Sequence, residues 1–300
     1  MRIATWNVNS IRTRAERVVD WLQRANIDVL AMQEIKCKPE QFPTDLFQRA
    51  GYSVTAFGLN QWNGVAFASR HEITDVATSF AEMPGFGNPV KGQEAVQLTG
   101  VNGLPQEARA LGVTVNGVRL WSLYVPNGRG LDNPHFDYKL DWLRALQRNV
   151  TGWLAENPEQ PLALMGDFNI APLPEDMGDP SFTVGESTHV SPAERELFAG
   201  FAPQLVDVVR PYQPEGYTFW DYTKLRFPRN EGMRIDFILG SEAFNDMVVA
   251  GEIHRDERKQ DNPSGIDIKP SDHVPVVCEI DQTLSDDEFA DDFDAPMIFG

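Results

Sequence analysis

Short clusters of polar residues stand at the ends of six apolar runs, spaced from one end of the chain to the other. They read Trp6-Asn7-Val8-Asn9, Gln33-Glu34, Tyr124-Val125-Pro126-Asn127, Gly166-Asp167-Phe168-Asn169, Arg234-Ile235-Asp236 and Ser271-Asp272-His273. Apolar runs of this length predict buried strands, and polar groups at strand ends are where an α/β scaffold assembles its chemistry. We therefore expect an α/β fold that gathers the six clusters in one cleft.

Strand and helix patterns mix along the chain without strict alternation. The turn signal Asn116-Gly117 predicts a hairpin between strands over 108–115 and 119–124. Other strands are predicted over 1–8, 27–34, 52–57, 64–69, 161–166, 234–239 and 274–280. Helices are predicted over 10–25, 39–50 and 137–156, with a further one beginning at 194, and loops over 80–106 and 171–193. This order favours two sheets packed face to face with helices outside, as one domain over residues 1–280 followed by a tail.

The composition allows a sizeable core, because 42% of the 300 residues are hydrophobic. We find no run of 18 apolar residues and no charged-then-apolar leader, and so expect neither a membrane span nor a signal peptide. Two cysteines, Cys37 and Cys278, are too few for a disulfide framework. This count fits a reducing compartment and predicts a cytoplasmic protein.

The net charge of −18 argues against nucleic acid as a partner, because phosphate binders are commonly basic. Seven acids in residues 281–300 account for part of it, and without them the charge is −11. A body this acidic needs a local basic cleft or a bridging cation to approach phosphates. The candidates for such a cleft are Arg12, Arg14, Arg70, Lys91, Arg129, Lys224, Arg226 and Arg229.

The types of polar residue in the clusters favour metal-assisted hydrolysis of a phosphodiester. Alone, Glu34 would more often be a solvated strand end, but with Asn7, Asn9 and Asp272 it predicts an oxygen-rich site for Mg²⁺ or Mn²⁺. No Cys and His cluster has the spacing of a zinc site. One metal or two is left open.

The remaining cluster residues have both a structural and a catalytic interpretation. Asp167 and Asn169 could form a simple turn, or Asp167 could orient or deprotonate water while Asn169 fixes the phosphate. Asp236 could hold His273 as a cation that neutralises charge on a pentacovalent phosphate. Tyr124, alone more often a core aromatic, would add a hydroxyl near the same oxygens.

Taken together, the six ordered motifs resemble those of the exonuclease III / AP endonuclease family, within the endonuclease–exonuclease–phosphatase superfamily. The resemblance covers residues 1–280 and implies a four-layered α/β sandwich, with two mixed sheets face to face and flanked by helices. It implies Mg²⁺-dependent hydrolysis of duplex DNA at abasic sites or 3′ ends, as AP endonuclease, 3′→5′ exonuclease, 3′-phosphatase and 3′-phosphodiesterase in unknown proportion.

The resemblance also implies roles for individual residues. Glu34 would be the principal metal ligand, with Asn9 and Asp272 near the metal. Asp167 would align or activate the attacking water, and Asp236 would pair with the catalytic His273. Three further residues would lie near the phosphate, namely Asn7, Tyr124 and Asn169. On the DNA side, Arg129 would pack against the duplex, while Phe219 and Trp220 would lie beside the abasic-sugar pocket.

One departure from the family pattern bears on the substrate. His189 stands where many AP endonucleases carry Gly or Ser, and our hypothesis is that it shifts activity towards 3′ ends. Met233, which is Trp in some relatives, also changes the pocket wall, and its effect is left open. Two alternatives remain: a phosphodiesterase or phosphatase on RNA or another phosphate ester, and a non-catalytic nucleic-acid-binding or protein-binding module.

The tail after residue 280 has a composition typical of disorder. Its acidic run ends in apolar residues, which could dock on a repair or replication protein. It could instead fold over the DNA cleft as an autoinhibitor, or simply add solubility. We expect a monomer. The apolar residues are Phe293, Met297, Ile298 and Phe299.

Overall fold

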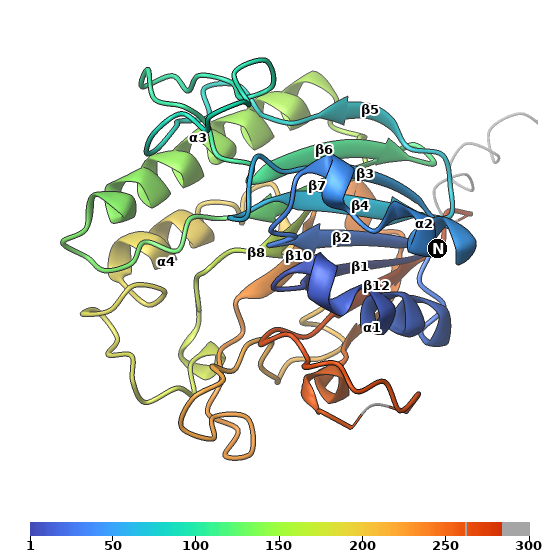
Figure 1. The fold of residues 1–300 in the computed structure, drawn as a ribbon. Helices are drawn as coiled ribbons and strands as arrows, with labels where there is room; N and C mark the ends of the chain where they lie inside the picture. Colours follow the sequence, from blue (N-terminus) through green and yellow to red (C-terminus); the bar gives the residue numbers. More distant parts are fainter. Residues whose placement is uncertain (262, 284–300) are drawn as a thin grey trace, which may run out of the picture.

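The computed structural model of the protein describes residues 1–261 and 263–283. The chain folds into two six-stranded sheets that pack face to face between helices (Figure 1). The apolar end of the tail, for which docking on a partner was one of three possibilities, lies outside the described residues. The expected boundary between domain and tail therefore stays a prediction.

The first sheet has the strand order β11-β12-β1-β2-β4-β3. Its one parallel pair is β1 with β2, and the other neighbours are antiparallel. The strands are β1 (Arg2–Asn7), β2 (Val29–Gln33), β3 (Ser53–Phe57), β4 (Val65–Ser69), β11 (Val248–Ile253) and β12 (Val276–Ile280).

The second sheet has the order β5-β6-β7-β8-β10-β9. Here β7 and β8 are parallel and the remaining pairs antiparallel, so both sheets are mixed as expected. The strands are β5 (Thr74–Ala77), β6 (Ala110–Val115), β7 (Val118–Tyr124), β8 (Leu162–Asp167), β9 (Val206–Asp207) and β10 (Asp236–Gly240).

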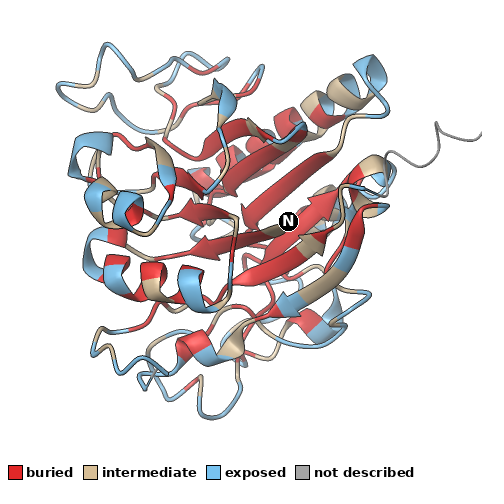
Figure 2. Cartoon of the chain, turned by 90° about the vertical axis from the view of Figure 1, so that its right-hand side faces the viewer, coloured by how far each residue is buried: buried red, intermediate tan, exposed pale blue. Residues whose placement is uncertain are grey.

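Helices form the outer two layers. The first sheet packs against α1 (Ile11–Arg24) and α2 (Thr44–Arg49), and the second against α3 (Pro134–Glu156) and α4 (Pro192–Ala199). Shorter elements are α5 (Glu242–Asn245) and the 3₁₀ turns η1 (Pro39–Gln41), η2 (Pro174–Asp176) and η3 (Arg255–Arg258). The expected four-layered sandwich is confirmed. In Figure 2 buried strands run through the middle, while the helices expose their outer faces.

The long apolar runs of the central strands follow from burial on both faces of each sheet. In β1, Ile3 joins the core between the two sheets, whereas its neighbours Ala4 and Trp6 join the core under α1. Successive strand residues point to opposite faces, so a strand in an inner layer needs apolar residues at both parities. Val18 and Leu22 supply the matching stripe of α1.

Three parts of the expected secondary structure differ from the observed one. The helix expected over 39–50 is split into η1 and α2, because Pro43 keeps Phe42 in extended backbone. Strands β5, β9 and β11 were not expected. They are edge strands with mostly exposed or half-buried residues, and therefore lack the apolar runs that predicted the others.

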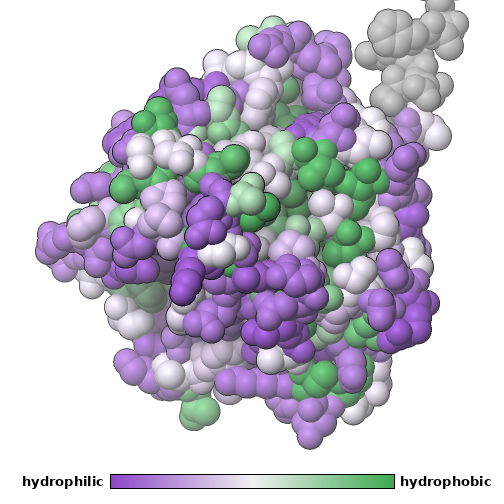
Figure 3. Space-filling view, turned by 45° about the horizontal axis from the view of Figure 1, so that its top comes forward, coloured by the Kyte–Doolittle hydropathy of each residue, from purple (hydrophilic) through white to green (hydrophobic). Residues whose placement is uncertain are grey.

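No helix in the described part of the chain is long and apolar enough to cross a membrane. Figure 3 turns the top of the molecule towards the viewer, and there hydrophobic and hydrophilic residues are interspersed.

Strand register brings the polar clusters to one edge of the sandwich. Asn7 ends β1 opposite Gln33 at the end of β2, and Tyr124 ends β7 opposite Asp167 at the end of β8. Asp236 begins the antiparallel strand β10 directly opposite Asp167. Because β1 packs against β8, and β2 against β7, these ends meet across the two sheets.

Candidate active site

The Asn7 amide joins the two sheets at the centre of the site. Its Nδ2 donates to Glu34 Oε1 and to Asp167 Oδ2, both at 2.9 Å. Glu34 follows β2 in the first sheet and Asp167 ends β8 in the second, so one amide fixes two carboxylates from different layers. Both amide hydrogens are used, and none is left to donate to a phosphate. Asn7 therefore positions the two carboxylates in this structure, and its expected place near the phosphate stays a prediction.

Oxygen ligands gather beside Glu34. Asn9 Nδ2 donates to Asp272 Oδ1 at 2.9 Å, while Lys36 Nζ lies 2.6 Å from Asn9 Oδ1 and 2.7 Å from Glu34 Oε2. Burial alone would raise the pKa of Glu34, but Lys36 and the Asn7 amide outweigh it and lower that pKa. The group therefore stays ionised, as a metal ligand must be.

A cluster of possible metal-ligand atoms lies in the same region. Glu34, Asp167 and His273 each place one possible ligand atom within 4.8 Å of the others. Two carboxylates and nearby amide oxygens are the donors that Mg²⁺ and Mn²⁺ prefer, so the residues fit a hard divalent cation.

His273 is held in a buried pair with Asp236. His273 Nδ1 lies 2.8 Å from Asp236 Oδ2, and its backbone N–H donates to Ser271 Oγ at 3.2 Å. Burial would lower the pKa of the imidazole, but the carboxylates of Asp236 and Asp167 outweigh it and raise the pKa to about 10. The ring is thus a cation at neutral pH, as the sequence predicted from this pair.

Asp167 is buried and interlocked with its neighbours. Its Oδ1 accepts the Asn169 backbone N–H at 2.9 Å, and its Oδ2 lies 3.7 Å from His273 Nε2. Burial raises its pKa to about 7, with the negative charges of Asp236 and Glu34 adding to the effect and the His273 cation opposing it. A carboxyl that titrates near neutral pH can both accept and release a proton at working pH.

Tyr124 lies on the other side of the same pocket. Burial, with the negative charge of Glu34, raises its pKa well above the ordinary value, so the phenol stays protonated and can donate. The guanidinium of Arg109 stacks on its ring at 4.7 Å.

His189 lies in the wall of the pocket as a neutral, oriented ring. Its Nδ1 lies 2.5 Å from the Asn169 carbonyl oxygen, which can only accept, so Nδ1 carries the proton. Its Nε2 therefore accepts from Asn127 Nδ2 at 3.3 Å. Burial, reinforced by the charge of Lys139, lowers the pKa of His189 to about 4.

A fully buried ion pair supports this wall from behind. Lys139 Nζ lies 2.5 Å from Glu194 Oε1, with both side chains inaccessible, and donates to the Asn169 carbonyl at 2.7 Å. Glu194 in turn accepts the His189 backbone N–H at 2.9 Å and completes a capping box with Ser191 at the start of α4. The pair thus ties together the chain after β8, the loop before α4, and α3.

Non-glycine residues with left-handed backbone concentrate at this site. They include Asn9 (φ 43°), Glu34 (φ 51°), Arg129 (φ 62°), Asn169 (φ 52°) and His189 (φ 74°). Such conformations cost free energy and persist where surrounding contacts impose them, which is common at functional sites.

The pocket in front of these groups has a volume of about 480 Å³. Most of the predicted residues line it, namely Glu34, Tyr124, Arg129, Asp167, Asn169, His189, Phe219, Asp272 and His273. Asn7 and Asp236 are buried behind this layer, and Asn9 lies beside it through its bond to Asp272.

Trp220 does not lie beside the pocket, contrary to the sequence-based expectation. It is fully buried in the core between the sheets, where its ring packs against Phe227 and Tyr217. Its neighbour Phe219 does face the pocket, with its ring 4.9 Å from that of His273. The two adjacent residues lie in extended backbone and point to opposite sides.

Few of the candidate basic residues are free at the pocket. Arg129, Lys224 and Arg226 line it, but Arg226 is paired with Asp179 and Glu231. Arg14 donates to the backbone carbonyl of Lys269 at 3.0 Å, and Arg70 pairs with Asp28. Among the described residues, Arg129 is the pocket arginine whose guanidinium makes no hydrogen bond or ion pair.

Three groups of the site were not predicted from the sequence. Lys36 follows Glu34 by two residues, and this Glu-x-Lys spacing was a usable signal. Lys139 falls on the apolar stripe of the helix that includes Leu143 and Leu146, and a charge on such a stripe indicates a buried partner. Asn127 is the fourth residue of the Tyr-x-Pro-Asn motif, but no role was predicted for it.

Comparison with known proteins agrees with this geometry. Residues 4–273 match the model of the endonuclease/exonuclease/phosphatase family. The exodeoxyribonuclease of Bacillus subtilis is 26% identical over 286 residues, covering 92% of this chain and 98% of its own. The solved 3′ phosphatase NExo from Neisseria, bound to a product DNA hairpin, is 34% identical with a TM-score of 0.78, covering 94% of this chain and 99% of its own.

An AP endonuclease from Archaeoglobus fulgidus is similar over the same region, at 31% identity with a TM-score of 0.76. The match covers 94% of this chain and 99% of that one. The family match covers the sandwich except strand β12 and the first residues of β1, and it includes every one of the six polar clusters. This protein therefore belongs to the endonuclease/exonuclease/phosphatase family.

Proposed function

We propose that the protein is a DNA-repair phosphodiesterase that acts mainly at 3′ ends. The observation that carries the proposal is the continuous chain of buried contacts from Asp236 through His273, Asp167 and Asn7 to Glu34. The similar proteins support DNA as the substrate, because they are an exodeoxyribonuclease, a 3′ phosphatase bound to DNA and an AP endonuclease.

Asp167 is the residue that aligns the attacking water and accepts its proton. It is the pocket-lining carboxylate that lies 3.7 Å from His273 Nε2, and two hydrogen bonds hold its oxygens in place. His273 then faces the phosphate with its Nε2, because Nδ1 is engaged by Asp236. The cation stabilises the charge that develops on the phosphate oxygens during in-line attack, and the protonated Tyr124 donates to the same oxygens.

The metal site of the proposal is formed by Glu34, Asp272 and Asn9. When bound there, Mg²⁺ or Mn²⁺ would supply a Lewis acid for the leaving 3′ oxygen. Lys36 Nζ contacts two of these residues, Glu34 and Asn9. The donor chemistry fits the ion and does not decide between one metal and two.

His189 is the residue we propose to set the substrate preference. Its buried ring is locked between the Asn169 carbonyl and the Asn127 amide, and it lines the pocket that holds the reacting groups. A side chain fixed in this way narrows the space that a displaced abasic sugar would need. A terminal 3′ phosphate needs less room, so 3′-end processing is favoured.

Two other functions remain as competitors. A phosphatase or phosphodiesterase on RNA or another ester would use the same central groups. A non-catalytic binding module would need none of them, yet Glu34, Asp167, Asp236 and His273 are all present and interlocked. Activity is therefore favoured over simple binding.

The test is release of phosphate from a DNA duplex with a 3′-phosphate, beside the matching RNA duplex. We expect turnover on DNA with Mg²⁺, none with chelator, and recovery when Mg²⁺ is restored. Glu34→Gln should lose most of the activity while its far-ultraviolet circular dichroism is unchanged. Turnover in chelator would refute the metal assignment, and preference for RNA would refute the substrate.

A further inference from the structure

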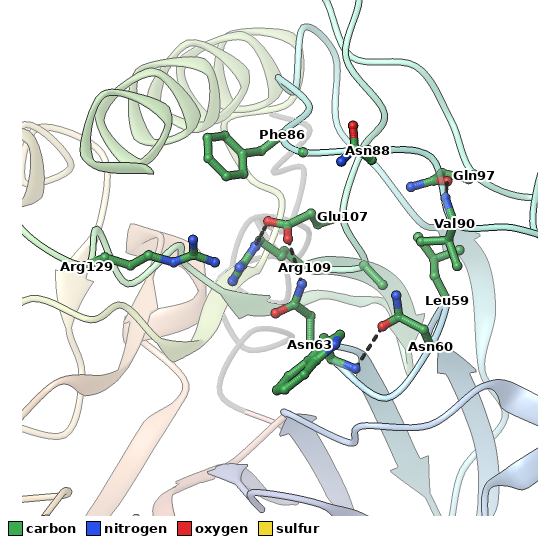
Figure 4. Close-up of a pocket in the computed structure, with 13 residues that line it drawn as sticks. Leu59, Asn60, Asn63, Phe86, Asn88, Val90, Gln97, Glu107, Arg109 and Arg129 are labelled. Atoms are coloured by element: carbon green, nitrogen blue, oxygen red, sulfur yellow. Dashed lines mark hydrogen bonds and ion pairs between the residues drawn. The ribbon is translucent and has the colours of Figure 1, made fainter. Parts of the chain in front are cut away.

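A second pocket opens beside the catalytic one and shares Arg129 with it. It has a volume of about 450 Å³, within the range of small-molecule binding sites. Two loops form it: the loop between β3 and β4, and the long segment between β5 and β6 that leads into Arg109 (Figure 4). We infer that this pocket binds an unpaired nucleobase of the DNA substrate, next to the nucleotide whose phosphate is attacked. The inference rests on the proposed function.

The side chains of this nucleobase pocket have the chemistry that recognises a base. Four carboxamides line it, and amides can both donate to and accept from the hydrogen-bonding edge of a base. Trp62 is 63% exposed and makes no ring contact among the described residues, so its face is free to stack. Phe86 adds a second aromatic ring to the wall. The carboxamides are Asn60, Asn63, Asn88 and Gln97.

Hydrogen bonds and close backbone packing fix the walls of this pocket. Gln97 accepts from Val90 N–H at 2.8 Å and donates to the Gln106 carbonyl at 3.0 Å, which closes one wall. Gly85 packs so closely against the Leu104 backbone that a side-chain carbon there would lie 2.1 Å from its carbonyl oxygen. These contacts hold the long segment in one shape.

A hydrogen-bonded floor connects this pocket to the catalytic one. Asn63 Nδ2 donates to Glu107 Oε1 at 3.0 Å, and Arg109 Nε donates to Glu107 Oε2 at 2.7 Å. The buried Arg109 guanidinium also stacks on the ring of Tyr124, which lines the catalytic pocket. Only the side chain of Tyr124 therefore separates Arg109, on which a ligand of this pocket would rest, from the catalytic pocket.

Charge and free polar groups favour a nucleotide over an uncharged ligand. Arg109 is neutralised by Glu107, whereas Arg129 makes no hydrogen bond or ion pair through its guanidinium within the described residues. In Figure 4 the Arg129 side chain extends towards Arg109 across the opening. Since Arg129 lines both pockets, it can bind a backbone phosphate between a base in one pocket and the scissile phosphate in the other.

The base must be unpaired, because a base inside a duplex is stacked on both faces and its Watson–Crick edge is paired, so that it can neither stack on Trp62 nor enter the pocket. Asn88 is exposed at the rim and forms no hydrogen bond within the described part of the chain, so its amide is available to such an edge. Frayed or mismatched 3′ ends present unpaired bases at low cost, whereas a paired duplex must first be opened.

The inference is tested with duplexes whose last three 3′ nucleotides are either mismatched or paired, each with 2-aminopurine at one of those positions. Binding is measured with the Asp167→Asn protein, so that the DNA is not consumed. We expect the emission of one mismatched 2-aminopurine to fall on binding. Adding Trp62→Ala should remove this fall and weaken binding of the mismatched duplex about tenfold, within the range for one stacked base.

Two control variants separate the possible failures. Trp62→Phe should retain most of the quenching, and Val101→Ala, on the same segment but outside the pocket, should change nothing. Equal affinity and equal emission with and without Trp62→Ala would overturn the inference while leaving the proposed function intact. Failure of the unmutated protein to process 3′ ends would instead refute the proposed function.

Discussion

The two pockets that share Arg129 are built in different ways. The catalytic pocket is made from strand ends, and its charged groups are buried and bonded to one another. The nucleobase pocket is made from loops, and it presents amides and an exposed tryptophan to solvent. Chemistry thus lies on the rigid sheets, while the groups that would select a substrate lie on the connections between strands.

Because of this difference, the two pockets should tolerate amino-acid substitutions to different extents. A substitution among the interlocked residues leaves a buried charge or a donor without its partner, so its effect should be large. A substitution in the loop-built pocket removes contacts that solvent can replace. This division between the two pockets predicts large effects of substitution in the first and small effects in the second.

The largest effect is expected from Asp167→Asn. The amide cannot accept a proton from water, so kcat should fall by about a thousandfold or more, within the scale for loss of acid–base catalysis. Steady-state kinetics on a 3′-phosphate duplex is the measurement. Asp221→Asn, at the exposed rim of the same pocket, is the matched control and should change kcat little. Similar losses in both variants would contradict the division.

The buried Lys139–Glu194 pair should matter most for stability. Lys139→Met leaves the Glu194 carboxylate buried without its counter-charge, so the free energy of unfolding should fall by about 3 kcal/mol or more. Denaturant unfolding measures the loss. Lys139→Met combined with Glu194→Gln should recover part of it, because the unpaired charge is gone. If the double variant recovered no stability, the pair would stabilise the fold through the packing of its side chains and not through its charges.

His135 should make stability depend on pH. Its buried Nδ1 accepts the Gly128 N–H at 3.1 Å, and burial, together with the charges of Arg109 and Arg129, lowers its pKa to about 4. Between pH 6.5 and 4 the unfolded chain binds a proton that the folded one does not, so stability falls as pH falls through this window. From pH 7 to pH 5 the contribution is about 2 kcal/mol.

The measurement for His135 is denaturant unfolding at pH 7 and pH 5. His135→Asn keeps an acceptor near the Gly128 N–H but cannot take up the proton. Its loss of stability between the two pH values should be smaller than that of the unmutated protein. Equal losses would assign the pH dependence to other groups, such as His189 and His254, whose pKa values are also lowered.

A smaller effect, on selectivity, is expected from His189→Gly. Glycine adopts the left-handed backbone of this position without strain, so the fold should be retained. Removing the ring opens the wall, and the ratio of abasic-site incision to 3′-phosphate release should rise about tenfold, equivalent to about 1.4 kcal/mol. An unchanged ratio would remove His189 from the account of substrate preference.

Much of the fold could be predicted because the central strands are buried on both faces and leave long apolar runs. The edge strands β5 and β9 could not, since nothing in their few exposed residues distinguishes them from loops. The residues that we propose as catalytic could be picked out as polar groups where apolar runs end. The buried position of Trp220 could have been predicted, because neighbouring residues in extended backbone point to opposite sides and Phe219 faces the pocket.

Other parts of the site depend on contacts that no local pattern encodes. Lys139 and Glu194 are 55 residues apart and meet only once α3 and α4 pack on the second sheet. The left-handed backbone of His189 follows from its bonds to Asn169 and Glu194. The nucleobase pocket joins loops separated by two strands, β4 and β5, so its shape exists only in the folded chain.

The central claim is that an interlocked catalytic pocket, narrowed by His189, hydrolyses DNA at 3′ ends. A gel assay on two labelled duplexes tests it most directly, one with an internal abasic-site analogue and one with a 3′ phosphate, each with Mg²⁺ and with chelator. The account predicts Mg²⁺-dependent loss of the 3′ phosphate that is faster than incision at the abasic analogue. Incision of the abasic duplex at an equal or higher rate, or turnover of neither, would contradict it.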